Sequence, residues 1–162
     1  MATPTTLPAT FVAGAVLTAA QQNALRGAFR VLQVVYASST TQTSTTSATY
    51  ATTTLAATIT PSATSSKVLI LANVQLSSNA AAQQSGLRIF DGSAAVLTNT
   101  RAMIQNGAGD LQVLMSQVFL DSPNTTSAKT YTVQFARISG AGTTTAQANS
   151  DPSTIILCEI SA

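Results

Sequence analysis

The chain has 162 residues, enough for one domain with a short appendage, and only 7% of them are charged, against about 25% in typical globular domains. Seven Lys or Arg and five Asp or Glu give a net charge of +2, and the scattered basic residues argue against a nucleic-acid-binding protein. No apolar run approaches the roughly 20 residues of a membrane-spanning helix, and the N-terminus lacks the pattern of a secretory signal. We therefore expect neither nucleic acid nor membrane as a partner. So low a charge suits a chain whose surface is largely covered by other proteins.

Residues 1–30 are predicted to form an extended arm followed by one short α-helix. Pro4 and Pro8 favour extended backbone, and the stretch from Thr18 to Gln21 matches a capping box that would start the helix. The segment is too short to build a core of its own, although it carries seven apolar side chains: Leu7, Phe11, Val12, Val16, Leu17, Leu25 and Phe29. We interpret it as a segment that docks on a partner. The alternatives are a disordered terminus and a segment folded back on its own domain.

Residues 31–162 are predicted to form an all-β domain, an antiparallel β-sandwich of the jelly-roll type. Its central strand is Lys67–Leu76, whose first half is apolar on both faces and needs strands beside it and a second layer over it. Leu111–Leu120 is another long strand with apolar residues on both faces at each end. The remaining predicted strands are Val31–Tyr36, part of Ala37–Ser47, Tyr50–Ile59, Gly86–Phe90, Ala94–Thr98, Arg101–Ile104, Thr130–Ile138, Thr143–Ala148 and Ser153–Ile160.

The sequence offers little catalytic equipment. It has no histidine, the commonest general base and catalytic-metal ligand. The single cysteine, Cys158, lies in an apolar strand and is predicted to be a buried structural thiol. Glu159 is expected to form an ion pair with Arg137 or Arg88. The other four carboxylates occupy turn positions: Asp91, Asp110, Asp121 and Asp151. We therefore expect no catalytic site, no metal site, no cofactor and no enzymatic activity.

Two sets of sequence phrases resemble structural proteins of tailed bacteriophages. Phe11–Gly27, FVAGAVLTAAQQNALRG, resembles the N-terminal segment of many tailed-phage virion proteins. Four phrases of the β-region resemble a module of marine and cyanobacterial phage structural proteins: Thr58–Val68 (TITPSATSSKV), Phe119–Thr126 (FLDSPNTT), Thr130–Phe135 (TYTVQF) and Ser153–Ala162 (STIILCEISA).

This resemblance implies a homotrimeric β-sandwich on the outer surface of the phage particle, used as a capsid decoration (cement) protein, a head fibre or a tail fibre. The chain is short and has neither shaft repeats nor coiled-coil heptads, which favours a compact knob bound directly to the virion. We therefore expect a decoration protein held on the major capsid protein through residues 1–30. The alternative is a head or tail fibre, the latter bound to tail proteins, whose sandwich loops bind a host surface glycan.

Overall fold

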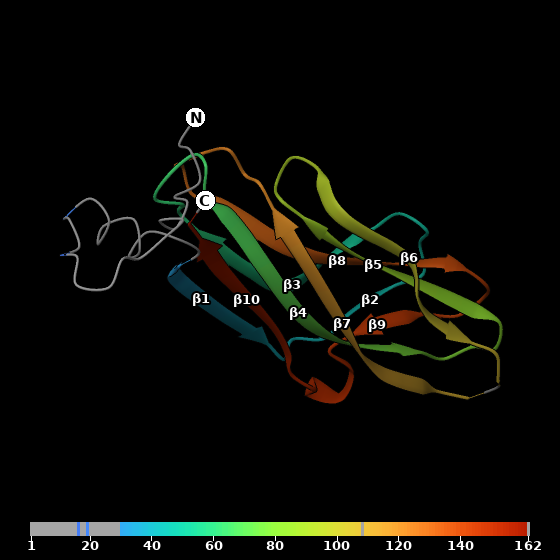
Figure 1. Ribbon diagram of the computed structural model, residues 1–162. Helices are drawn as coiled ribbons and strands as arrows, with labels where there is room; N and C mark the ends of the chain where they lie inside the picture. Colours follow the sequence, from blue (N-terminus) through green and yellow to red (C-terminus); the bar gives the residue numbers. More distant parts are fainter. Residues whose placement is uncertain (1–15, 17–18, 20–29, 108, 162) are drawn as a thin grey trace.

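The computed structural model describes residues 16, 19, 30–107 and 109–161 (Figure 1). The expected arm and the helix beginning at Thr18 lie outside the described residues, apart from Val16 and Ala19. Within 30–107 and 109–161 the chain is mostly β-strand, and its only helical element is a 3-10 turn, η1 (Ala148–Ser150). None of the described residues belongs to a helix long and apolar enough to cross a bilayer.

The strands agree closely with the alternation of the sequence. One correction concerns Ala94–Thr98 and Arg101–Ile104, which were expected as separate strands and form one, because shifts in its pairing with the preceding strand let the ladder continue. In chain order the strands are β1 (Val31–Ser39), β2 (Thr43–Thr45), β3 (Ala51–Ile59), β4 (Lys67–Ser78), β5 (Gln83–Phe90), β6 (Ala95–Gln105), β7 (Leu111–Asp121), β8 (Lys129–Ser139), β9 (Thr144–Ala146) and β10 (Ser153–Ile160).

The strands form two antiparallel sheets. Sheet A has the order β1-β10-β4-β7, with β9 and β2 continuing beside the C-terminal end of β4, and sheet B has the order β3-β8-β5-β6. Figure 1 shows sheet A in front of sheet B. The pairs are nested: β1 pairs with β10, β3 with β8, β4 with β7, and β5 with β6. The first four long strands, β1, β3, β4 and β5, therefore pair with the last four in reverse order, β10, β8, β7 and β6.

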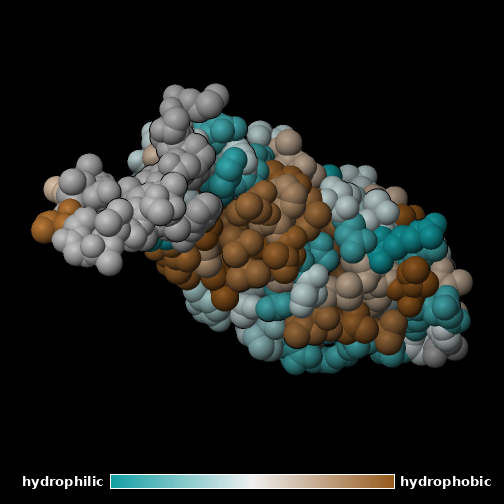
Figure 2. Space-filling view, in the orientation of Figure 1, coloured by the Kyte–Doolittle hydropathy of each residue, from teal (hydrophilic) through white to brown (hydrophobic). Residues whose placement is uncertain are grey.

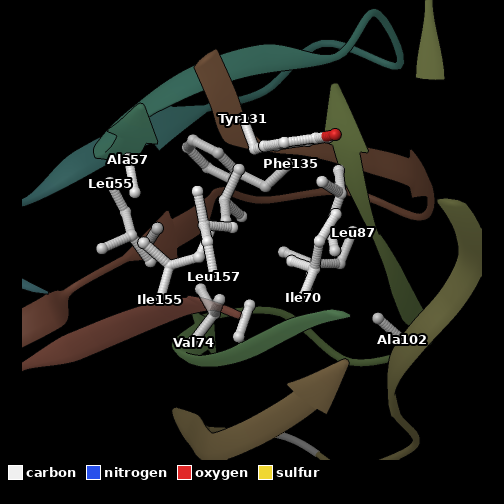
Figure 3. Close-up of a cluster of buried hydrophobic side chains, with 14 of the residues drawn as sticks. Leu55, Ala57, Ile70, Val74, Leu87, Ala102, Tyr131, Phe135, Ile155 and Leu157 are labelled. Carbon is white, nitrogen blue, oxygen red and sulfur yellow. The ribbon is translucent and has the colours of Figure 1, made fainter. Parts of the chain in front are cut away.

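The core lies between the two sheets, where inward side chains of both meet (Figure 3). Strand β8 illustrates the pattern, since Tyr131, Val133 and Phe135 all point inward and are fully buried, as its alternating sequence predicts. From sheet A, Ile70 and Leu157 are buried against them. Burial of each large apolar side chain contributes roughly 1.5–3 kcal/mol, so this layer accounts for the association of the two sheets.

Candidate interaction surface

The outer face of sheet A, turned away from the core, is apolar across all four of its long strands. Because Val68 and Ile70 point into the core, the alternation of β4 places Leu69 and Leu71 on the outside. Their ladder partners on β1, β10 and β7 are apolar as well, so two rows of four side chains cross the sheet. The rows are Val34, Cys158, Leu69 and Leu120, and Tyr36, Ile156, Leu71 and Val118. We call these eight residues the apolar face.

The apolar face is accessible to solvent within the described chain. Tyr36 on β1 is 61% exposed and Val118 on β7 is 62% exposed, whereas the residues of the two central strands are half-buried between their neighbours. Figure 2 shows a large hydrophobic patch over this sheet, with smaller hydrophobic groups elsewhere on the same side of the molecule. Contiguous apolar patches of this kind on soluble proteins mark interaction sites.

Uncharged polar residues border the apolar face on one side. The next row across the same four strands is Ser38, Thr154, Asn73 and Ser116, in which the Ser116 hydroxyl donates a hydrogen bond of 2.7 Å to Asn73 Oδ1. On the opposite side, Lys67 Nζ donates to Ser122 Oγ at 2.7 Å. The apolar face itself thus carries no charge, and a cation occurs only at its margin.

The outer face of sheet B has a different character. Thr52, Thr54 and Thr58 of β3 are exposed there, and Thr58 Oγ1 lies 2.7 Å from Thr130 Oγ1 across the β3–β8 ladder. The guanidinium of Arg88 stacks 4.4 Å from the centre of the Tyr50 ring on the same side. The sandwich therefore presents one polar outer face, suited to water, and one apolar outer face, suited to a partner.

The sequence contained the signal for this surface. The first half of β4 is apolar on both faces, which predicted cover on both sides. Sheet B covers the inner side only, and nothing among the described residues covers Leu69 and Leu71 on the outer side. The sequence also predicts attachment through residues 1–30. Of the seven apolar residues named there, only Val16 is described, and it is 92% exposed. The other six lie outside the described residues: Leu7, Phe11, Val12, Leu17, Leu25 and Phe29.

Cys158 does not occupy the buried position expected for it. It points outward from β10, half-buried in the middle of the apolar face, because Leu157 is the neighbour that points into the core. The strand IILCEI carries apolar residues on both of its sides, so its sequence alone does not tell which side faces the core.

Glu159 is fully buried on the inward side of β10, and its expected ion pair with Arg137 or Arg88 is wrong. Its partners are neutral: Ser62 donates through its backbone N–H (2.7 Å) and its hydroxyl (2.6 Å), and Gln33 Nε2 donates at 2.6 Å. Burial raises the pKa of Glu159, but hydrogen bonds from Ser62, Gln33 and Ser66 outweigh it and lower the pKa to about 2. The carboxylate is therefore ionised near neutral pH and serves as an acceptor that holds the 60–66 loop.

The two arginines have other partners. Arg88 Nε donates to Gln134 Oε1 at 2.6 Å, and Arg137 Nη1 donates to the carbonyl of Gly142 at 3.2 Å. Both therefore stabilise sheet B and its turns.

Two of the remaining carboxylates, Asp91 and Asp121, have local structural roles. Asp91 caps its turn by accepting hydrogen bonds from the backbone of Ser93 and Ala94, and it pairs with Lys129 Nζ at 2.6 Å. Burial raises the pKa of Asp91, but the bonds from Lys129, Ala94 and Ser93 outweigh this and hold the pKa well below its usual range. Asp121 accepts a 2.6 Å hydrogen bond from the Tyr131 hydroxyl. No group of three or more His, Cys, Asp or Glu in the described part of the chain could hold a metal ion.

A shallow depression of about 350 Å³ lies beside the apolar face. Gln75 Oε1 accepts a hydrogen bond of 2.7 Å from the N–H of Ala148, which places η1 next to Gln75. The depression combines one carboxylate, two side-chain amides and apolar surface, and its lining residues are Gln75, Gln112, Val113, Leu114, Asp151 and Pro152.

The fold and the surface define an all-β, two-sheet antiparallel sandwich that has apolar side chains across the outer face of one sheet. No protein-family model matches the chain, and no curated protein matches it significantly. Among solved structures, the chain is similar to the VP2 subviral particle of infectious bursal disease virus, with 14% identity and a TM-score of 0.45. It is also similar to a structure of the Gx strain of that virus, with 16% identity and a TM-score of 0.43. Each match covers 80% of this chain and 38% of the viral chain, so this chain spans about two fifths of those proteins. Likeness at this TM-score establishes neither a family nor a function.

Proposed function

We propose that the chain is a non-enzymatic structural protein of a bacteriophage virion, namely a homotrimeric capsid decoration protein. The observation that carries the proposal is the apolar face: eight apolar side chains in register over four strands, opposite a threonine-rich outer face on the other sheet. A protein with this asymmetry is suited to assembly, because burial of its apolar face against a partner is favourable, whereas its polar face is well hydrated in water. The sequence phrases that resemble tailed-phage virion proteins support the virion as the place of assembly.

Residues 1–30 are proposed to attach the trimer to the major capsid protein, with the sandwich on the outer surface of the particle. Ordering an extended segment costs about 1–2 kcal/mol per residue in backbone entropy. Phe11 and Leu7 are suitable anchors, because full burial of a large apolar side chain contributes roughly 1.5–3 kcal/mol. Three arms on one trimer would add their binding through avidity.

We also infer that the domain, residues 31–162, is a jelly roll. The support is the nested pairing of its eight long strands. Strand β1 pairs with β10, β3 with β8, β4 with β7, and β5 with β6. A jelly roll consists of two such wrapped four-stranded sheets.

The experiment that tests the attachment role is deletion of residues 2–16. The truncated protein should keep its β-sheet circular dichroism and its trimer mass, yet fail to decorate particles that lack the native protein. Decoration at the level of the full chain would refute attachment through the arm. Copy number provides a second test, because a decoration protein should be abundant in purified particles.

A second candidate is a head or tail fibre protein whose loops bind a host surface glycan. The depression lined by Gln75, Gln112 and Asp151 favours it, because carboxylate and amide groups are suitable partners for sugar hydroxyls. A fibre should be scarce in purified particles and should bind a glycan array, and Asp151→Ala should abolish that binding. Absence of glycan binding together with high copy number would eliminate this candidate.

A further inference from the structure

We propose that the apolar face, together with the free edge of β7, is the surface through which copies of this chain meet. The inference rests on the proposed homotrimer and names its interface. The occupant of the apolar face is thus a second copy of the chain.

The size of the apolar face fits the core of a stable interface. Strands lie about 4.8 Å apart and side chains of one face repeat about every 6.7 Å, so its two rows cover roughly 250 Å², and roughly 320 Å² with the flanking Leu32 and Ile160. A standard interface removes about 800 Å² from each partner, with an apolar centre and a polar rim. The row of Ser38, Thr154, Asn73 and Ser116 provides such a rim on one side.

The chemistry of the apolar face suits another copy of itself. None of its eight residues is charged, so two copies would meet without like-charge repulsion or the desolvation of an unpaired charge. Burial of apolar surface against apolar surface is favourable and non-directional, so it does not require one particular orientation of the partner.

The edge strand β7 gives an independent argument. Its eleven residues pair with β4 without a break in register, and β4 is its only ladder partner among the described residues. Isolated proteins protect such edges with lysine, proline or a bulge. The sequence of β7, LQVLMSQVFLD, has no basic residue and no proline, and its only charge is Asp121 at the end. An edge strand of this length without these protections is expected to be covered.

The positions of the strands suit a closed ring of three. Strands β1 and β7 lie at opposite ends of the four-stranded face, and their exposed residues include Tyr36 on β1 and Val118 on β7. A three-fold axis in front of the apolar face would bring β7 of one copy beside β1 of the next. Such a head-to-tail contact closes into a ring of three when successive copies are related by a three-fold rotation.

Cys158, the single cysteine of the chain, is a native reporter at the centre of the apolar face. The experiment measures the rate of maleimide labelling of folded full-length protein, together with its mass by sedimentation. Val118→Lys places a charge in the proposed interface, and Ile104→Lys is the matched control, because Ile104 is a comparably exposed apolar residue on β6 of sheet B. Tyr36→Lys repeats the test from the opposite end of the face.

We expect the wild-type protein and Ile104→Lys to be trimers with slow labelling. Val118→Lys and Tyr36→Lys should raise the trimer dissociation constant by more than about a hundredfold and label rapidly, with unchanged circular dichroism. Slow-labelling trimers of both face variants, or rapid labelling of a wild-type trimer, would overturn this inference and leave the proposed trimer intact. A wild-type monomer would contradict both.

One further variant tests cover by the chain's own arm. If Phe11→Asp with Phe29→Asp in the full chain accelerates labelling of Cys158 without loss of the trimer, the arm covers the face and the inference is wrong. Unchanged slow labelling supports cover by a second copy.

Discussion

Glu159 and Ser62, which are 97 residues apart in sequence, are joined by two hydrogen bonds of 2.7 and 2.6 Å to the same carboxylate oxygen. The second oxygen accepts from Gln33, whose amide also donates to the carbonyl of Thr60 at 2.7 Å. One buried charge thereby connects β1, β10 and the 60–66 loop that leads into β4. Hydrogen bonds to a charged group are stronger than those between neutral groups, which explains how a buried carboxylate is tolerated without a cation.

Glu159→Gln should destabilise the fold by about 1.5–3 kcal/mol, because an amide cannot accept from Ser62 and from Gln33 at both of its ends. The measurement is urea unfolding followed by circular dichroism. Asp110→Asn is the control, since Asp110 is an exposed turn residue, and it should change the free energy of unfolding little. Equal stability of the two variants would contradict the role assigned to Glu159.

Stability should fall in acid. Glu159 has its pKa lowered from 4.5 to about 2 by folding, so the unfolded chain binds its proton at a higher pH than the folded chain. Its contribution is therefore fully present above about pH 5 and is lost as the pH falls towards about 2. Asp91, whose pKa is also lowered, acts in the same direction. Urea midpoints across this range should fall less steeply for Glu159→Gln than for the wild type, and equal slopes would count against the mechanism.

Gly86→Ala should destabilise the domain. A Cβ atom at Gly86 would lie 2.5 Å from the Tyr50 hydroxyl oxygen and 2.9 Å from Ile138, so the Tyr50 ring that carries Arg88 would have to move. Overpacking of this kind typically costs about 1–3 kcal/mol. Gly107→Ala is the matched control, because nothing lies within 4 Å of its Cβ position. Thermal unfolding should show a lower midpoint for the first variant only, and a similar midpoint in both would show that Tyr50 is not confined.

Association should depend little on salt, because the apolar face carries no charge. Between about 0.05 and about 0.5 M NaCl we expect the trimer dissociation constant to change less than about twofold by sedimentation. Lys67→Gln, at the margin of the face, should behave in the same way. A steep loss of association with salt would point to an electrostatic interface elsewhere on the sandwich.

Much of the fold could be predicted because its strands are encoded locally. The alternation of TYTVQF placed Tyr131, Val133 and Phe135 on one buried face, and the bounds expected for the final strand, Ser153–Ile160, are those of β10. Strands β2 and β9 were less visible. Each is only three residues long, TST in β2 and TTA in β9, and they are held by pairing with each other and, for β9, with the end of β4.

The candidate surface and the partners of Glu159 could not be derived in the same way. Strands β4 and β10 are apolar on both sides, and which side faces sheet B depends on pairing between distant segments, so Cys158 was placed in the core. For Glu159, opposite charges were the expected partners, whereas a serine far away in sequence provides the hydrogen bonds. Hydroxyl and amide donors are too common in this chain for the sequence to single one out.

Sedimentation equilibrium of the full-length protein at micromolar concentration tests the central claim most directly. A protein whose apolar face is covered by further copies of the chain should have three times the mass of the 16.5 kDa chain, in low and in high salt alike. A stable monomer at that concentration would contradict the account, because no second copy of the chain would then cover the apolar face.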